Sequence, residues 1–530
     1  MRKTILIFLM IFVSFSLFSC SESTIIDPPE PVVDEDEKPE PDPESEEIPD
    51  DKEPELDPKE EFIYTINYAK SIDDYYLYTD MHLYEADQEI PLYNCKVNFS
   101  HTWNGEAPMR MNSGVGIVEL SGKVKFHLET YFKINNIVTI RPLAKEVMFE
   151  AFDNYIDFII EETGDYTVEF SNQRTLHLFV YDIEEEVPEN TIYFGPGIHN
   201  KDNSSYINSS GVINIGSNQH IHLALGAILE ARLVSNNTNN VKITGRGIIA
   251  GAKFERSVER GKTFIPFDFG HVTNLLFKDI ICLDPAGWCY NLYFCNHLEL
   301  DGIKIISSRS NGDGVSLQSC QNAYVHNVFV RSWDDSLVIK NYPEWSNRNI
   351  EGTTKNIVFD NCLIWTDLAQ SLEIGFETIG QVMEDIHFTN ITVLHNFHKP
   401  VISIHNGNNA YIKNVSYKNI IVEEAKMGRG DGKNVLIEIQ NLFSTTWSSS
   451  HKTTALGFIE GITIEDMYVY NASNPQIVIT GTIDKRFGYD NQEVHFVKDV
   501  TIKNLYINNE KIDTNYELLV TEYLTNLILE

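Results

Sequence analysis

Two different hydrophobic patterns divide the chain. From residue 62 to 187, short runs alternate apolar and polar residues with a period of two, as around Val124, Phe126 and Leu128, and turn residues separate the runs. An alternation of this kind places every second side chain on one buried face of a strand. Several short strands within about 125 residues predict a small antiparallel β-sandwich domain.

From residue 188 to 530 the chain repeats one short motif, in which apolar residues alternate with other residues and a turn former (Asn, Asp or Gly) stands fifth. The nine copies are VKITG from Val241, LLFKD from Leu275, LELDG from Leu298, AYVHN from Ala323, IVFDN from Ile357, IHFTN from Ile386, VSYKN from Val415, ITIED from Ile462 and VTIKN from Val500. Their starts lie 23 to 47 residues apart. Short strands at this spacing predict a parallel β-helix whose coils stack on one another. The long stretches of helical periodicity that a helical solenoid needs are absent.

Residues 1 to 19 have the features of an export signal. Arg2 and Lys3 precede an apolar run of about a dozen residues, which is too short to span a bilayer comfortably. The run ends in Leu-Phe-Ser-Cys, which resembles the end of a bacterial lipoprotein signal with Cys20 as the lipidated residue. An ordinary secretory signal cut nearby is the alternative. We therefore expect an exported protein, lipid-anchored at the bacterial outer membrane or cell surface, or in the periplasm, that meets the membrane only through this anchor.

Residues 20 to 61 form an acidic, proline-rich linker. From residue 21 onward the segment holds nine prolines and 19 acidic against 3 basic side chains, so that charge repulsion keeps it disordered and extended. A solvated tether explains this composition better than calcium binding, and we expect no metal and no other cofactor. The formal net charge of −36 argues against nucleic acid as a partner, because nucleic-acid binding needs basic surface.

Six cysteines remain after Cys20. They are Cys95, Cys282, Cys289, Cys295, Cys320 and Cys362. No two of them form a Cys-x-x-Cys pair, so the sequence does not indicate a zinc site. Export permits disulfides, but five of the six lie in strand-like repeats, where a small buried apolar side chain fits well. We expect buried free thiols.

Three aspartates stand out in the repeat region: Asp313 and, 21 and 22 residues later, Asp334 and Asp335. The shortest coils span about 22 to 25 residues, so this spacing places the three at one angular position on adjacent coils, about 4.8 Å apart. Mutual repulsion should then raise at least one pKa. Hydrolysis of a glycosidic bond needs one protonated and one ionised carboxyl group. The alternative is that these aspartates only cap turns, and the adjacent pair can act together only if the strand bends there.

The block from Asp284 to Glu377 resembles the polygalacturonases of glycoside hydrolase family 28 and the dextranases and isopullulanases of family 49. DPAGWCYNLYFC is similar to the SPxW segment of family 28, NGDG to NTDG, WDDSLVIK to GDDCIAIK and SLEIG to GLSIG. The order of these motifs and the 21-residue interval match as well. The resemblance implies that residues 188–530 form a right-handed, pectin-lyase-like parallel β-helix. The β-sandwich domain before it is similar to the one that the dextranases carry.

By position, the resemblance implies a role for each aspartate. Asp334 would be the general acid, while Asp313 and Asp335 would hold and activate a water molecule, giving hydrolysis with inversion. The two carboxyl groups of an inverting pair lie about 6.5–9.5 Å apart. This distance exceeds the rise of one coil, so the acid and the base would have to splay.

Three departures from family 28 bear on the substrate. Where the family has a glycine before the aspartate pair, this chain has Trp333, which we expect to be a sugar platform because aromatic faces pack well on pyranose rings. The family's histidine is replaced by Ala369 and Gln370, and its Arg-Ile-Lys motif falls near ISIHNG, which leaves His405. These losses favour a neutral or differently charged glycan over galacturonan. The further substrate-binding candidates are Trp288, Lys340, Gln370, Glu373, Glu377 and His405, and Tyr342 and Trp345 could shape subsites.

The sequence therefore predicts a monomeric glycoside hydrolase that cleaves a polysaccharide with Asp313, Asp334 and Asp335. Two alternatives stay open. A β-helix polysaccharide lyase would use a Lys or Arg base, usually with calcium, and would release unsaturated products. A non-catalytic glycan-binding surface protein would keep its ligand when Asp334 is replaced by Asn.

Overall fold

The structure is a computed structural model of the 530-residue chain. It describes residues 62–99, 109–134, 137–184, 186–256, 264–342, 352–429, 432–442, 456–483 and 493–530. The described residues belong to one compact unit, Leu56–Glu530. The export signal, Cys20, the acidic linker and Trp345 lie outside the described residues, so those predictions are untested.

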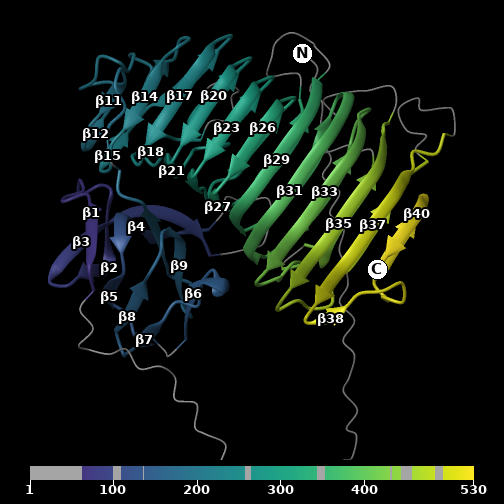
Figure 1. The fold of residues 1–530 in the computed structure, drawn as a ribbon, viewed down its shortest axis with the longest axis horizontal. Coiled ribbons are helices and arrows are strands. Elements are labelled where there is room, and N and C mark those ends of the chain that lie inside the picture. Colours follow the sequence, from purple (N-terminus) through teal and green to yellow (C-terminus); the bar gives the residue numbers. More distant parts are fainter. Residues whose placement is uncertain are drawn as a thin grey trace, which may run out of the picture. The chain divides into compact units, whose positions relative to one another are not determined.

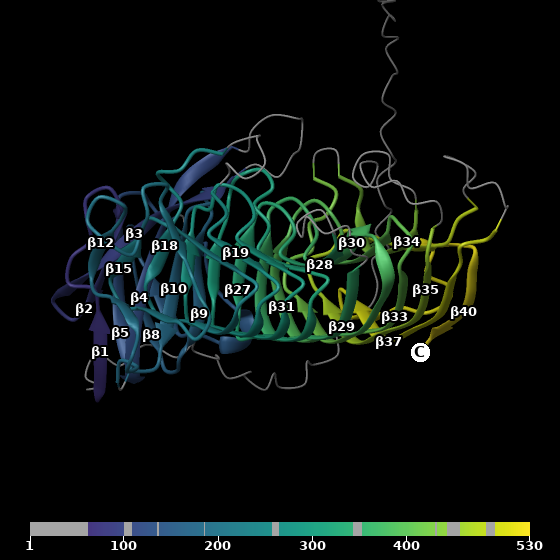
Figure 2. The ribbon, with the colours of Figure 1, turned by 90° about the horizontal axis from the view of Figure 1, so that it is seen from above.

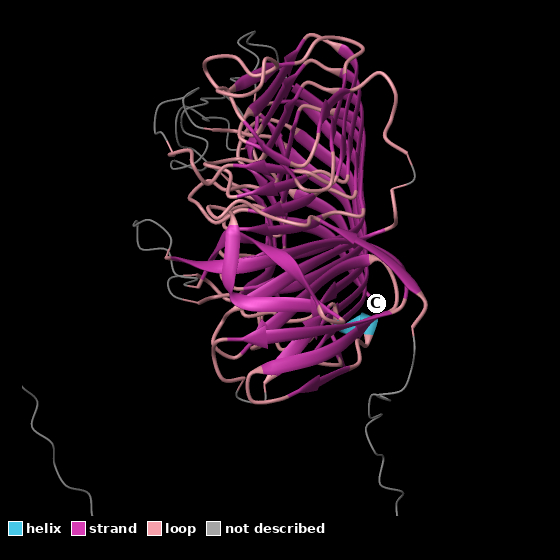
Figure 3. Cartoon of the chain, turned by 90° about the vertical axis from the view of Figure 1, so that its left-hand side faces the viewer, coloured by secondary structure: helices cyan, strands magenta, loops and turns pink. Residues whose placement is uncertain are grey.

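The described part of the chain consists almost entirely of strands and loops (Figure 1). Its helix content is one 3-10 turn, η1 (Leu143–Lys145), visible in Figure 3. Within these ranges, no helix has the length and apolar composition needed to cross a membrane.

The first ten strands form one sheet, which corresponds to the predicted sandwich domain. They are β1 (Tyr64–Tyr68), β2 (Leu77–Glu85), β3 (Gln88–Asn98), β4 (Arg110–Gly122), β5 (Val124–Thr130), β6 (Val138–Arg141), β7 (Phe149–Ala151), β8 (Tyr155–Ile160), β9 (Gly164–Phe170) and β10 (Thr175–Tyr181). Their order is β6-β9-β10-β4-β3-β2-β5-β8-β7, and β1 also pairs with β4. The pairs are antiparallel except for β10 with β4. This parallel pair joins two antiparallel halves, one formed by β6, β9 and β10 and the other by the strands from β4 to β7 in this order, so that all of them belong to one continuous sheet.

One face of this sheet encloses a hydrophobic core. Val124, Phe126 and Leu128, whose alternation predicted an inward face, are fully buried in it. The ring of Phe132, just after β5, lies 5.1 Å from the ring of Phe170 in β9, so residues from both halves of the sheet meet. The period-two pattern thus predicted the buried face correctly.

The remaining strands wind into a right-handed parallel β-helix with two long sheets (Figure 2). The 19-stranded sheet consists of β11 (Ile192–Phe194), β12 (Gly197–His199), β14 (His220–Leu223), β15 (Ala227–Leu229), β17 (Asn239–Gly245), β18 (Ile248–Ala250), β20 (Thr273–Lys278), β21 (Ile281–Leu283), β23 (Asn296–Asp301), β24 (Lys304–Ile306), β26 (Gln321–His326), β27 (Phe329–Ser332), β29 (Gly352–Thr366), β31 (Gly380–Asn396), β33 (Tyr411–Val422), β35 (Phe458–Val469), β37 (Val497–Ile507), β38 (Glu510–Lys511) and β40 (Leu524–Leu529). The 11-stranded sheet consists of β13 (Val212–Asn214), β16 (Arg232–Asn236), β19 (Phe267–Gly270), β22 (Tyr290–Tyr293), β25 (Val315–Gln318), β28 (Leu337–Asn341), β30 (Leu372–Thr378), β32 (Ile402–Asn406), β34 (Val435–Asn441), β36 (Gln476–Thr480) and β39 (Leu519–Glu522). The predicted fold class is confirmed.

The nine sequence repeats align with one another in the 19-stranded sheet. Their third residues, from Ile243 in the first copy to Ile502 in the last, pair in register and are buried. Every fifth residue has a positive φ angle; these residues are Gly245, Asp279, Gly302, Asn327, Asn361, Asn390, Asn419, Asp466 and Asn504. Gly, Asn and Asp adopt this conformation at least cost. The turn former recurs because each coil bends at this point.

The six cysteines of the described ranges are buried and free, as predicted. They fill space inside the molecule.

The second face of the N-terminal sheet packs on the 19-stranded sheet of the β-helix. Phe179 of β10 lies 5.3 Å from Phe329 of β27, ring to ring, within a buried apolar cluster that both parts share. Lys304 Nζ donates to Asp165 Oδ2 at 2.6 Å, in a buried ion pair across the same contact. The contact involves the 19-stranded sheet, while the three aspartates are associated with the 11-stranded one.

Candidate active site

Asp313 and Asp335 stand at the same position on two consecutive coils. Val315 pairs with Leu337 in the register of β25 and β28, two residues after each aspartate. The amide of Gly314 donates to the carbonyl of Asp335 at 2.8 Å. Asp313 is 1% exposed and Asp335 is 8% exposed. The fold therefore brings together two carboxyl groups that lie 22 residues apart in the sequence.

Asp334 lies in the bend between β27 and β28 and is partly exposed. Its Oδ1 atom accepts a hydrogen bond from the amide of Asp335 at 3.2 Å, and the amide of Asn311 also donates to its carboxylate. The strict alternation of side chains holds only within a strand. At this bend the two neighbouring aspartates interact with each other and with Asp313, as the catalytic hypothesis requires.

A buried chain of hydroxyl groups lies behind this bend. Ser332 Oγ donates to the Asp334 carbonyl at 2.7 Å. The hydroxyl oxygens of Ser332, Ser336, Thr366 and Ser371 form a row in which each lies 2.7 Å from the next. At the far end, Asn396 Nδ2 donates to Ser371 Oγ at 2.9 Å. A carbonyl only accepts and each hydroxyl carries one proton, so donation runs in one direction, from Asn396 to Asp334. The five side chains are fully buried. Because they come from three successive coils, the coils that follow hold the bend in place.

Lys340 in β28 supplies the positive charge of the cluster. Its Nζ atom lies 3.8 Å from Asp313 Oδ2, 3.6 Å from Asp335 Oδ2 and 3.4 Å from Glu377 Oε2. Burial alone would lower the pKa of Lys340, but these carboxylates and Asp334 raise it well above its ordinary value. Within the described ranges, no group of three or more His, Cys, Asp or Glu side chains could hold a metal ion.

The pKa values of the three aspartates are all raised. For Asp313 the causes are burial and then repulsion by Asp334, which together raise its pKa well above the ordinary value although Lys340 opposes them. Burial also raises the pKa of Asp334, against the effect of Lys340. Burial, with repulsion by Asp334 and Glu373, raises the pKa of Asp335 to about 8 despite Lys340. The cluster therefore retains at least one proton near neutral pH.

His405 is enclosed between two glutamates from neighbouring coils. Its Nδ1 atom lies 2.9 Å from Glu373 Oε1 and its Nε2 atom lies 3.0 Å from Glu438 Oε2. Burial lowers its pKa, but the two glutamates outweigh burial and raise it to about 10. Both ring nitrogens are thus engaged, and Ser403 donates a further hydrogen bond to Glu373. His405 positions Glu373 in this structure and does not present a free N–H group to a substrate.

The two tryptophans near the aspartates differ in exposure. Trp333 is 1% exposed, so the expectation that it forms a sugar platform is wrong: no face of its ring is open to a sugar. The bend that carries Asp334 turns Trp333 inward. Trp288 is half-buried, and Lys340 Nζ lies 5.1 Å from its ring centroid. Of these two, Trp288 is the one that borders the acid cluster.

Gln370 and Glu377 also lie at or next to the cluster. The backbone amide of Gln370 donates to Asp335 Oδ1 at 3.4 Å, and its side chain is buried. Glu377 reaches the cluster through Lys340. Sequence reasoning did not single out Glu438 or Arg256, which hydrogen-bonds Asn311 and lowers the pKa of Asp334. Both act across coils, so no local motif marks them.

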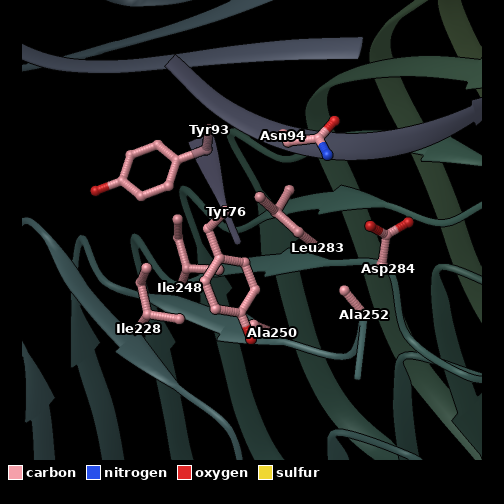
Figure 4. A pocket seen from close by; sticks show the side chains of 9 residues that line it. All are labelled: Tyr76, Tyr93, Asn94, Ile228, Ile248, Ala250, Ala252, Leu283 and Asp284. Atoms are coloured by element: carbon pink, nitrogen blue, oxygen red, sulfur yellow. The ribbon is translucent and has the colours of Figure 1, made fainter. Parts of the chain in front are cut away.

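A cavity of about 10 Å³ lies apart from the acids, between the N-terminal sheet and the β-helix (Figure 4). Its lining residues are Tyr76, Tyr93, Asn94, Ile228, Ile248, Ala250, Ala252, Leu283 and Asp284. This volume holds no more than about one water molecule. Asp284 has its own partner there, because its carboxylate accepts a hydrogen bond from the Lys96 amide at 3.0 Å. The cavity is a packing gap of the domain contact.

No protein-family model and no curated protein sequence matches the chain. Among solved structures, Dex49A from Penicillium minioluteum aligns with 83% of this chain and 93% of its own, at 12% identity and a TM-score of 0.50. The chain has the fold of Dex49A. A hyperthermoactive exopolygalacturonase from Thermotoga maritima aligns with 64% of this chain and 83% of its own, at 15% identity and a TM-score of 0.43. A polygalacturonase from Erwinia carotovora ssp. carotovora aligns with 65% of this chain and 99% of its own, at 14% identity and a TM-score of 0.43.

Proposed function

We propose that this protein is a glycoside hydrolase that cleaves O-glycosidic bonds of an extracellular polysaccharide. The observation that carries the proposal is the acid cluster, in which Asp313, Asp334 and Asp335 lie together with raised pKa values around one lysine. The motif resemblance to families 28 and 49 supports the same chemistry. Glycosidic hydrolysis needs a proton donor and a proton acceptor on either side of the bond, and a cluster that retains a proton beside a fixed positive charge supplies both.

In the proposed mechanism Asp334 is the general acid. It is the partly exposed member of the three, so its proton can reach the oxygen of the leaving sugar. Asp313 and Asp335 bind the attacking water; their raised pKa values keep this pair mostly protonated near neutral pH, and Lys340 favours the ionised form, which takes up the water proton. The water oxygen bonds to the anomeric carbon as the bond to the leaving oxygen breaks, which inverts the configuration at that carbon.

The charges around the cluster favour a polysaccharide without carboxylates. The carboxyl groups near the aspartates include those of Glu373 and Glu377, whereas the cations Lys340 and His405 each already contact two or three carboxylates. A uronate would add a negative charge to this group of carboxylates, and like charges at this range are costly. We therefore propose a neutral glycan as the substrate.

The test is the release of reducing ends from a panel of polysaccharides, including dextran and pectin, by the protein and by Asp334→Asn. We expect cleavage of a neutral polysaccharide and a loss of about 10²–10⁴-fold in kcat for the variant. Anomeric configuration of the first product, followed by NMR, reports inversion. A variant with undiminished hydrolysis would remove Asp334 from the acid role, and unsaturated products would point to a lyase.

We further propose that the protein acts as a monomer outside the cytoplasm, tethered to the membrane through a lipid on Cys20. The lipoprotein-like signal and the acidic linker support this placement. Metabolic labelling with a fatty acid, compared between the natural chain and Cys20→Ser, tests the anchor. Label retained by the Cys20→Ser chain would refute it.

A further inference from the structure

The N-terminal sheet carries a group of aromatic side chains on its outer face. Along β2, β5 and β8, which are neighbours in this sheet (Figure 1), every second residue is buried in the domain core, as Leu83, Phe126 and Phe158 are. The residues between them point the other way, toward solvent. Six aromatic rings gather there, and we call them the outer aromatic platform. They are His82, Tyr84, His127, Tyr155 and, just beyond the strand ends, Tyr131 and Phe152.

The rings of the platform contact one another from strand to strand. Tyr84 pairs with His127 in the register of β2 and β5, and their ring centroids lie 6.1 Å apart. The ring of His127 lies 4.8 Å from that of Tyr155, which in turn stacks on Phe152 at 4.4 Å. Neighbouring strands are about 4.8 Å apart, so the platform follows the sheet across three strands without a break.

Hydrogen bonds hold the two histidines of the platform in place. His82 Nδ1 lies 2.6 Å from Glu89 Oε1, and His82 Nε2 lies 3.0 Å from the hydroxyl group of Tyr131. His127 Nδ1 lies 2.6 Å from Asp157 Oδ1. A side chain that is already ordered loses less conformational freedom when a ligand binds to it. The platform is therefore preorganised.

The platform is open to solvent. Tyr131 and Phe152 are 76% and 40% exposed, and the side chains of His82 and His127 keep 26% and 34% of their surface exposed. Aromatic surface exposed in this way is unfavourable in water. A continuous patch of it on a soluble protein marks a place where a ligand or a partner binds.

Acidic side chains beside the rings restrict what can bind. Glu89 and Glu129 are 52% and 51% exposed, whereas Lys125 on the same face is paired with Asp157 at 3.0 Å. This excess of negative charge disfavours nucleic acid, an anionic lipid surface and a second copy of the same face. A neutral polysaccharide complements both features, because its hydroxyl groups donate to carboxylates and its sugar rings pack on aromatic faces.

We propose that the outer aromatic platform is a binding site for a neutral polysaccharide, separate from the acid cluster. The polymer lies across β2, β5 and β8, with sugar rings on the aromatic faces and hydroxyl groups directed to Glu89 and Glu129. The platform belongs to the N-terminal sheet and the three aspartates are associated with the 11-stranded sheet, so the platform holds the polymer without taking part in bond cleavage. The inference goes beyond the proposed hydrolase function, since binding here needs no catalysis.

The test is affinity electrophoresis in gels that contain dextran, amylose, a soluble β-glucan or polygalacturonate. Tyr131→Ala/Phe152→Ala removes two rings that lie outside the strands, and Tyr193→Ala/Tyr324→Ala removes two exposed rings of the 19-stranded sheet as the control. All proteins also carry Asp334→Asn, so that no polymer is cut during the run. We expect at least one neutral polysaccharide to retard the protein with the natural platform. Its dissociation constant should be about tenfold higher for Tyr131→Ala/Phe152→Ala and unchanged for the control, and mobility in polygalacturonate should be the same for all.

The outcomes separate the platform from the hydrolase. Equal retardation of Tyr131→Ala/Phe152→Ala and the natural platform, or no retardation by any neutral polysaccharide, overturns the proposal. Phe152→Trp keeps a ring and should bind like the natural platform; a loss of binding there would trace the effect to a disturbed sheet and overturn it as well. Dimers in sedimentation that Tyr131→Ala/Phe152→Ala converts to monomers would assign the face to a second copy instead. Reducing-end release is measured independently, so either proposal can fail while the other stands.

Discussion

Asp313 and Asp335 lie at the same position on consecutive coils, and their Oδ2 atoms are 3.8 and 3.6 Å from a single ammonium group, that of Lys340. Because both acids are buried and share this one cation, it is the charge that stabilises either of them in its ionised form. We therefore expect the same arrangement to affect both the proposed chemistry of the site and the response of the fold to pH.

Replacing Lys340 with Met should shift the pH profile of hydrolysis. Without the ammonium group, burial and mutual repulsion meet less opposition at Asp313 and Asp335, so their pKa values rise further. We expect the acidic limb of kcat/KM to move upward by about 1–3 pH units, measured as reducing ends across the pH range. Lys242→Met, at an exposed position, is the matched control. An acidic limb that stays in place would contradict the role of Lys340.

The raised pKa of Asp335 should make the fold less stable as pH rises. Its pKa is about 8 in the folded chain and about 3.9 when unperturbed. Between these values the folded state holds a proton that the unfolded state has released. The free energy of unfolding therefore falls with increasing pH, by up to about 1.4 kcal/mol per pH unit, and the loss is complete above the folded pKa.

Asp335→Asn removes this titration, which makes it the direct check. Urea unfolding at several pH values, from about 5 to 8, should show the natural protein losing stability relative to the variant as pH rises. Asp87→Asn, in the exposed turn between β2 and β3, should follow the natural protein. A constant difference between the natural protein and Asp335→Asn would mean that Asp335 is ionised throughout.

Thr366→Val should interrupt the hydroxyl chain behind the aspartate bend while nearly preserving shape. The change leaves Ser336 without its donor and Ser371 without its acceptor, and both are fully buried. We expect a loss of about 1–3 kcal/mol in unfolding free energy and a lower kcat at similar KM, because the bend that holds Asp334 loosens. Thr463→Val, on β35 of the 19-stranded sheet, is the control. An unaltered kcat in a destabilised protein would make the chain purely structural.

Replacing Trp333 should mainly lower stability, whereas replacing Trp288 should mainly weaken substrate binding. Trp333→Ala empties a fully buried volume and should cost about 3–5 kcal/mol of unfolding free energy. Trp288→Ala, at the half-buried position beside Lys340, should weaken oligosaccharide binding by about tenfold with a smaller loss of stability. Denaturant unfolding and calorimetry measure the two effects. The reverse pattern would return the role of sugar platform to Trp333.

Much of the fold could be predicted because the repeat is local. A turn former at a position that needs positive φ, after two inward-facing apolar residues, marks one bend of each coil, and all nine copies behave in this way. Aligning successive coils by this repeat then predicts that Asp313 stacks on Asp335, without knowledge of the intervening loop. The motif does not contain the partners from other coils, which is why the sequence alone did not reveal Glu438 or the hydroxyl chain.

The sequence by itself determined the parallel β-helix, the antiparallel domain before it and the meeting of three aspartates, since periodicity and coil length specify strands and their register. Tertiary structure decided which way side chains point where the chain leaves a strand. At the bend after β27 the alternation of faces ends, so Trp333 turns inward while Asp334 stays partly exposed. Tertiary structure also decided which charges are paired. Lys340 and His405 can be counted in the sequence, but only the packed coils show that carboxylates already surround both.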